Sequence, residues 1–153
     1  WFNDAEVCEG NSHHRFPNYN QNMQEYFEST IRSRANLVLA ICDKETDLHV
    51  GNVSLLDIDA VNQVAEFAIL IGDKEYWGKQ IGSEAMKLIV SHGFRELHLH
   101  RIYFGTFDSN IGMQQLGLTH GFQEEGRSRE AVWKAGKWKS IFHYGILSDE
   151  WKY

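Results

Sequence analysis

The apolar pattern of the chain changes period at residues 72–75, and this change constrains the fold more than any other feature. Before it, the apolar run Val64–Ile71 predicts a strand. After it, apolar residues recur at helical spacing and predict a helix over about 81–94. The segment is therefore a strand, a loop and a helix in direct succession.

The connecting loop, Tyr76–Ser83, has features of a phosphate-binding turn. Gly78 and Gly82 let a ligand approach the backbone closely, and Lys79 adds positive charge. The first helical turn presents backbone amides without partners, which favours an anion. The glycine spacing matches neither a P-loop nor a dinucleotide-binding turn. Taken alone, the pattern is equally compatible with an ordinary strand-to-helix turn.

The remaining pattern predicts one α/β domain over residues 1–153 with a mixed sheet. Asn3, followed three residues later by Glu6, has the spacing of a helix N-cap. The expected elements are a short helix over Asp4–Cys8, a helix over 21–34, a buried strand over 37–42, strands over 50–58 and 97–107, a helix over 110–120, and a hairpin of 121–133 and 138–147.

Composition excludes several classes of function. The net charge of −6 disfavours nucleic-acid binding, and no apolar stretch reaches the roughly 20 residues of a membrane span. Cys8 and Cys42 are too few for a disulfide framework, which fits a reducing cytoplasm. The sequence begins at Trp1 without a signal-peptide pattern, and an additional first strand before it is compatible with this start.

Two segments in order, Ala65–Ile69 and Tyr76–Ala85, resemble the acetyl-CoA motif of the GNAT superfamily of N-acetyltransferases. The chain is most similar to the branch of ribosomal-protein alanine, spermidine and nucleotide-amino-sugar acetyltransferases. Further matches follow at Asp108–Asn110 and Gly121–Gly126, so the resemblance covers essentially the whole chain. It implies a mostly antiparallel sheet of six to seven strands, about four helices, and acetyl-CoA as co-substrate.

The resemblance also implies which residues hold acetyl-CoA. Backbone groups of one strand would pair with the pantetheine arm, loop amides would hold the pyrophosphate, and Asn110 would bond the arm. These residues are Ile69, Leu70, Ile71, Trp77, Gly78, Lys79, Gln80, Ile81, Gly82, Ser83 and Asn110.

The chain departs from the superfamily pattern in two places. Gln80 stands where a Gly is expected, and we predict that it has already entered the helix, which avoids a strained positive φ. Gly117 occupies the position at which the superfamily often has the Tyr that protonates the leaving thiolate. The usual general acid is therefore absent, and no metal site is expected in its place.

Acetyl transfer to an amine requires a proton acceptor. Glu66 is the first candidate, because it interrupts an apolar strand beside the expected cleft, although a surface ion pair is the alternative. Asp57 is a weaker candidate that can equally face solvent. Ser109 could protonate the thiolate or act as an N-cap.

The acceptor pocket is harder to assign. Arg15, Phe16 and Tyr19 of the early loop are candidate substrate-binding residues, and Arg15 would suit an anionic acceptor or simply lie on the surface. The aromatic hairpin is compatible with pocket walls, with packing, or with a homodimer. Structural roles are the expectation for the histidines.

The predicted function is transfer of an acetyl group from acetyl-CoA to a primary amine by direct attack in a ternary complex. A peptide or protein N-terminal amine is the first choice of acceptor. A nucleotide-linked amino sugar or a polyamine is the alternative, and an idle acyl-CoA-binding module is the rival from another class.

Overall fold

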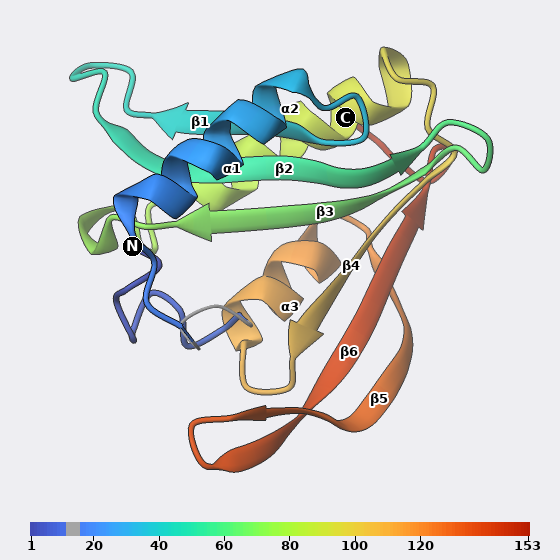
Figure 1. Ribbon diagram of the computed structural model, residues 1–153. Coiled ribbons are helices and arrows are strands. Elements are labelled where there is room, and N and C mark those ends of the chain that lie inside the picture. Colours follow the sequence, from blue (N-terminus) through green and yellow to red (C-terminus); the bar gives the residue numbers. More distant parts are fainter. Residues whose placement is uncertain (12–15) are drawn as a thin grey trace.

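The computed structural model describes residues 1–11 and 16–153. Within them, six strands form a single sheet in the order β1-β2-β3-β4-β6-β5 (Figure 1). The elements in chain order are α1 (Asn20–Arg32), β1 (Leu37–Cys42), β2 (His49–Asp59), β3 (Val64–Ile71), the 3₁₀ turn η1 (Lys74–Tyr76), α2 (Ile81–Arg95), β4 (Arg101–Phe107), α3 (Ile111–Thr119), β5 (Gln123–Lys134) and β6 (Lys137–Leu147).

The sheet is mixed, and β3–β4 is its parallel pair. This confirms the predicted class, with three α-helices in the described residues where about four were expected. Helix α1 lies on one face of β1–β3 and α2 on the other (Figure 1). No helix in the described part of the chain is long and apolar enough to cross a membrane.

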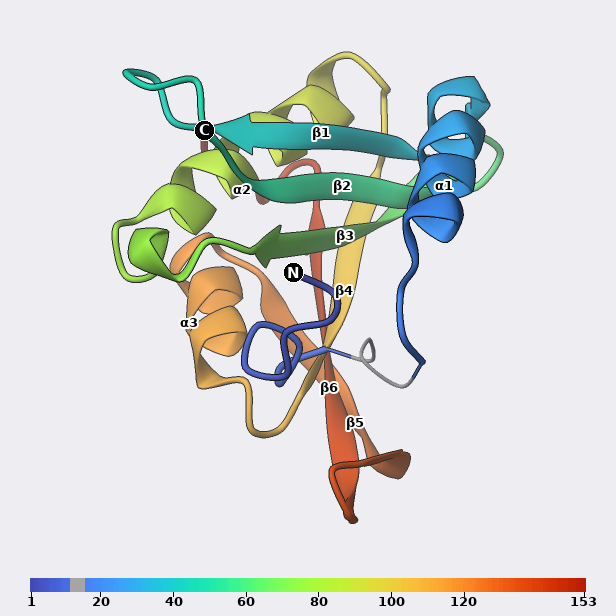
Figure 2. The ribbon, with the colours of Figure 1, turned by 60° about the vertical axis from the view of Figure 1, so that its left-hand side comes forward.

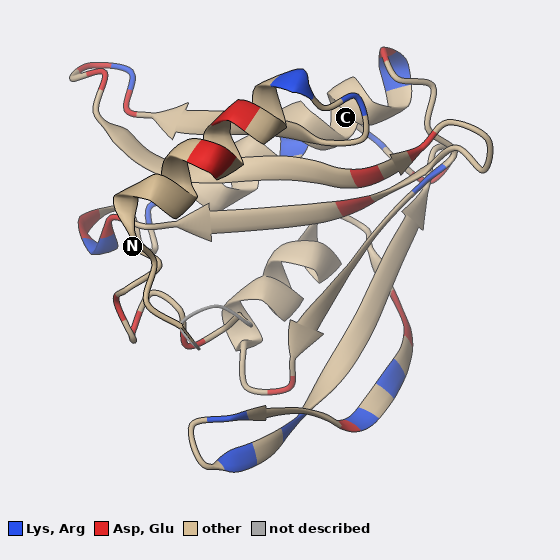
Figure 3. Ribbon diagram, viewed as in Figure 1, with Lys and Arg blue, Asp and Glu red and all other residues tan. Residues whose placement is uncertain are grey.

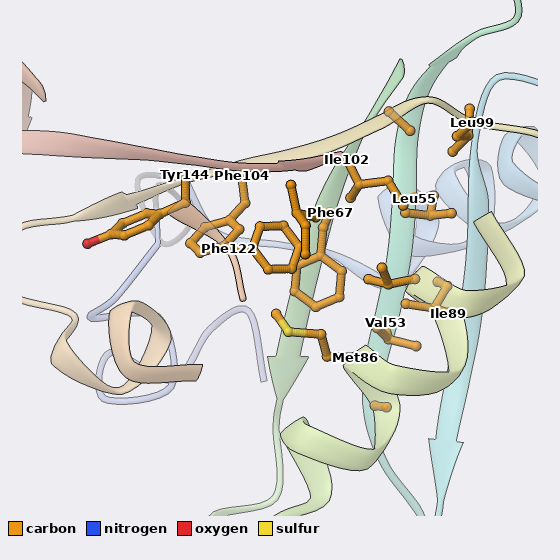
Figure 4. Close-up of a cluster of buried hydrophobic side chains, with 14 residues drawn as sticks. Val53, Leu55, Phe67, Met86, Ile89, Leu99, Ile102, Phe104, Phe122 and Tyr144 are labelled. Carbon is orange, nitrogen blue, oxygen red and sulfur yellow. The ribbon is translucent and has the colours of Figure 1, made fainter. Parts of the chain in front are cut away.

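The hydrophobic core lies between the sheet and α2 (Figure 4). Alternate residues of β2, β3 and β4 point into it, as strand geometry requires. Its largest members include Leu55, Phe67, Phe104 and Met86, each exposed by 2% or less. Helix α3 packs against the same cluster through Met113 and Leu116. The core therefore holds both helices on one face of the sheet.

Three sequence predictions are corrected. Residues 4–8 form a single turn and not a helix, because Asn3 bonds the backbone of Asn18 and Asp4 caps the turn instead. Strand β1 is the sheet edge and has no buried residue. Strand β4 begins at Arg101 and not Leu97, because His98 adopts φ +54° and interrupts the extended chain.

Candidate active site

The parallel strands β3 and β4 separate after a short paired segment. Their register runs from Val64↔Arg101 to Glu66↔Tyr103 and ends there. Beyond this point β3 continues to Ile71 and the two strands diverge (Figures 1 and 2). A wedge-shaped gap therefore opens within the sheet, with Glu66 and Tyr103 at its narrow end.

The backbone of β3 presents hydrogen-bonding groups to this gap. The Gly72 N–H donates to the Val50 carbonyl at 2.9 Å, so even-numbered residues of β3 direct their backbone towards β2. Ile69 and Ile71 therefore direct their backbone N–H and C=O groups into the gap, as the predicted pantetheine interaction requires. Leu70 does not, which corrects its predicted role. The Ile71 carbonyl already accepts a hydrogen bond from the Trp77 indole at 2.8 Å.

The loop after β3 turns through two left-handed residues, Gly78 at φ +73° and Gln80 at φ +64°. Gln80 is the N-cap of α2, so the prediction that it had entered the helix is wrong. The turn needs a left-handed residue to redirect the chain into α2. Within the loop, the amides of Tyr76, Trp77 and Ser83 donate to backbone carbonyls of the protein. Anion binding by the amides of residues 78–82 stays a prediction. Lys79 lies 5.0 Å from the Tyr76 ring centre.

Gly82 marks the position where the loop, β3 and α3 meet. A Cβ built on Gly82 would lie 3.7 Å from Leu116 of α3 and 3.8 Å from Ile69 of β3. Leu116 is thus the wall opposite β3, and sequence reasoning missed it. The apolar pair Met113 and Leu116, at i and i+3 of α3, is the signal that could have identified this wall.

Asn110 lies at the start of α3, where it caps the helix. Its Oδ1 accepts from the Met113 N–H at 3.1 Å, and its Nδ2 donates to the Gly10 carbonyl at 3.2 Å. The cap belongs to Asn110 and not to Ser109, whose exposed hydroxyl accepts from the Lys139 ammonium at 2.8 Å. Contact of Asn110 with the pantetheine arm stays a prediction.

Glu66 is half-buried at the narrow end of the gap. Burial raises the pKa of its carboxyl, and the negative charge of Asp57 raises it further. Burial and the negative charges of Glu66 and Asp57 raise the pKa of the Tyr103 hydroxyl. Sequence reasoning did not identify Tyr103 as a site residue. Acidic segments of β2 and β3 lie side by side here (Figure 3). The exposed Asp57 lies within the β-bulge between Leu56 and Asp59 and contributes charge.

A glycine-containing loop, a strand pair that opens beside it and a carboxylate at the narrow end of the opening form the candidate site. The acetyltransferase (GNAT) domain model matches residues 1–123. The chain belongs to the GNAT acetyltransferase family. The family uses acetyl-CoA.

Similar proteins agree with this assignment. "Probable N-acetyltransferase YjcK" of Bacillus subtilis is 32% identical over 119 residues, covering 71% of this chain and 66% of that protein. The spermidine N(1)-acetyltransferase of Vibrio cholerae is 26% identical over 129 residues, covering 84% and 73%. The chain spans 45–66% of the length of five Bacillus relatives that it matches.

A solved structure extends the likeness to the whole fold. The spermidine N-acetyltransferase from Vibrio cholerae, crystallised in complex with CoA and spermine, superposes with a TM-score of 0.89 at 23% identity. The match covers 97% of this chain and 86% of that one. At this identity it shows the GNAT fold.

The GNAT leaving-group Tyr is not only absent at Gly117 but sterically excluded there. Gly117 is buried, and a Cβ at this position would lie 2.5 Å from the Phe104 ring. Phe104 belongs to the core, so it has no room to retreat. The thiolate must take its proton from another donor or from water.

Two of the three predicted acceptor residues belong to the described part of the chain. Phe16 and Tyr19 are 83% and 62% exposed before α1, and Arg15 lies outside the described residues, as do His13 and His14. No three His, Cys, Asp or Glu side chains in the described part of the chain come together as metal ligands.

A polar hollow of about 720 Å³ lies outside the gap. Its lining residues are Asp108, Arg127, Arg129, Glu130, Trp138 and Ser140. None of them belongs to the loop 76–83 or to β3, so this hollow is separate from the candidate site.

Proposed function

We propose that this protein transfers the acetyl group of acetyl-CoA to a primary amine that binds at Glu66. The observation that carries the proposal is the position of Glu66, a half-buried carboxylate at the closed end of a gap whose open end meets the phosphate-binding loop. From Glu66 to Ile71 the strand spans roughly 17 Å. An elongated cofactor can therefore have its phosphates at one end and its thioester at the other.

The residues present divide the reaction between them. Glu66 accepts the proton of the amine, whose nitrogen then attacks the thioester carbonyl in a ternary complex. A backbone N–H of β3 directed into the gap stabilises the oxyanion. The C–S bond breaks, and the thiolate takes a proton from water or another donor because Gly117 supplies none.

A polyamine is the acceptor class that we place first. Glu66 and Asp57 are both negative at the narrow end of the gap, which favours a substrate with more than one ammonium group. The likeness to spermidine acetyltransferases supports the same choice. A peptide N-terminal amine, the first choice from sequence, becomes the second. An anionic amino sugar has no support among the described residues near Glu66.

Thiol release measured with a colorimetric thiol reagent tests the proposal. Spermidine, spermine, an alanine-ended peptide and a nucleotide-linked amino sugar would each be offered with acetyl-CoA. We expect turnover with at least one polyamine and a lower kcat/KM for the peptide. Acetyl-CoA binding without thiol release for any amine would instead indicate an idle acyl-CoA-binding module.

A further inference from the structure

The buried side chain of His120 connects the two helices beside the acetyl-CoA loop. It follows the last turn of α3 and is 3% exposed. Its Nδ1 lies 2.8 Å from the Leu116 carbonyl oxygen, and its Nε2 lies 3.0 Å from Ser83 Oγ in the first turn of α2. His120 therefore links α3 to the end of α2 that faces the phosphates.

The hydrogen-bond partners determine where the protons lie. A carbonyl oxygen only accepts, so Nδ1 carries a hydrogen whether the ring is neutral or cationic. In the neutral ring Nε2 must accept the Ser83 O–H. In the imidazolium Nε2 donates to Ser83 Oγ, and the Ser83 hydroxyl hydrogen is released to point elsewhere. The charge of His120 thus sets the direction of the Ser83 hydroxyl.

We propose that His120 is a positioning residue for the pyrophosphate of acetyl-CoA and that binding of this anion draws a proton onto Nε2. With neutral His120, Ser83 presents oxygen lone pairs to the anion, which is repulsive. With the imidazolium, the Ser83 O–H can donate to a phosphate oxygen, and a positive charge lies behind it. The inference rests on the proposed function, because it requires the phosphates at this loop.

The groups around His120 come from α2, α3 and the C-terminal segment. The rings of Trp151 and Tyr153 lie 6.4 Å and 5.6 Å from the imidazole centre. From α2 come the exposed Glu84 and the Lys87 ammonium, which is 4.9 Å from the centre of the Tyr153 ring. Helix α3 contains no charged residue. The phosphates of bound acetyl-CoA would add negative charge on the Ser83 side of the ring, which favours the imidazolium.

Calorimetry with dephospho-CoA tests this coupling. The ligand lacks the 3′-phosphate monoester, whose own titration near pH 6 would add protons. Binding would be measured between pH 6 and 8 in buffers of different ionisation enthalpy. We expect net proton uptake and an affinity that falls by up to about tenfold per pH unit as the pH rises. In turnover assays His120→Asn should raise KM for acetyl-CoA and leave kcat nearly unchanged.

Two variants test the hydrogen bond between His120 and Ser83. In His120→Asn the shorter amide can still reach the Leu116 carbonyl but not Ser83, and Ser83→Ala removes only the hydroxyl. Each should abolish most of the proton uptake, and the double variant should match either single one. Ser83→Ala also serves if His120→Asn does not fold. The matched control is His143→Asn, because His143 Nε2 lies 2.8 Å from Ser128 Oγ in the β5–β6 hairpin. It should keep the full uptake.

The two proposals fail in different ways. If wild-type protein binds dephospho-CoA with no proton uptake, or if His120→Asn keeps the wild-type uptake, the coupling is wrong and the acetyltransferase proposal stands. If wild-type protein binds neither CoA form at any pH, the proposed function is wrong and the coupling falls with it.

Discussion

Ionisation of Glu66 should control the acidic limb of the pH–rate profile. A base works only when ionised, so the rate should rise with pH through the raised pKa of this carboxyl. Glu66→Gln should lower kcat by about 10²–10⁴-fold and flatten the limb. Profiles of kcat against pH measure both effects. Glu96→Gln, at the exposed C-cap of α2, is the control. A Glu66→Gln enzyme with nearly full activity would exclude the base role.

The same substitution should have the opposite effect on stability. Because the folded pKa of Glu66 lies above its unfolded value, the stability it contributes is complete below the unfolded pKa and is lost as pH rises through the folded one. Near neutral pH the uncharged Gln avoids this loss. Urea unfolding should show Glu66→Gln more stable than wild type at about pH 7.5, with the difference gone near pH 4.

Gln80 holds a conformation that glycine adopts more easily. Its φ of +64° crowds Cβ against the backbone, at a cost of about 1–2 kcal/mol for an L-residue. Gln80→Gly should therefore stabilise the fold by up to about 1 kcal/mol after the entropy of glycine is counted. Gln80→Ala keeps the Cβ and should show no gain. Equal midpoints for both variants in urea would argue against strain at this position.

An ion pair braces the edge of the sheet across strand β6. Arg101 of β4 bonds both carboxylate oxygens of Glu125 in β5, and β6 lies between these strands. A Cβ on Gly145 of β6 would meet Arg101 and would lie 2.5 Å from Glu125 Oε1. Because Gly145 has no side chain, the ion pair between Arg101 and Glu125 can cross β6 at this position.

Gly145→Ala should break this brace and destabilise the protein by on the order of 1 kcal/mol. Bonds from Arg101 hold the pKa of Glu125 below its usual value, so the stability from the pair is lost as pH falls through that lowered pKa. Urea unfolding should therefore show a Gly145→Ala deficit at neutral pH that shrinks in acid. The losses of stability from Gly145→Ala and Glu125→Gln should not add in the double variant, because both remove the same ion pair. Full additivity would show that Gly145→Ala acts through another contact.

The whole fold should respond to acetyl-CoA. A ligand present at a hundred times its Kd adds about 2.7 kcal/mol to the unfolding free energy, or roughly 5–10 °C in Tm for this size. Gly82→Leu should fill the space between Ile69 and Leu116 and abolish the shift while the free protein melts normally. Gly82→Ala, whose Cβ fits at ordinary contact, is the control. A full Tm shift in Gly82→Leu would show that the cofactor does not bind in the gap between β3 and β4.

The homodimer stays a prediction, and the exposed aromatic side chains of the β5–β6 hairpin are the surface that could form it. Trp133 and Trp138, each more than half exposed, stack edge to face with ring centres 5.3 Å apart. Such a surface suits a protein partner. Sedimentation of wild type and Trp138→Ser would show whether it joins two copies; a monomer in both cases would exclude this.

Much of the fold was predictable because it depends on near neighbours. The periods of β3 and α2 identified both elements to within one residue at each end, since apolar spacing along the chain determines which face is buried. The glycines of the loop are an equally local signal. The proposed acetyl-CoA site and the candidate base Glu66 rest on these signals together with the family resemblance.

The remaining features depend on contacts between distant segments, which no local pattern encodes. The left-handed Gln80, the edge position of β1 and the exclusion of a side chain at Gly117 each result from packing around them. His120 and Ser83 meet only because α2 and α3 share one core. The sequence determined that a glycine-containing loop follows a strand and leads into a helix. The tertiary structure decided that this strand separates from β4 at Glu66, because the two strands share a register of only three pairs.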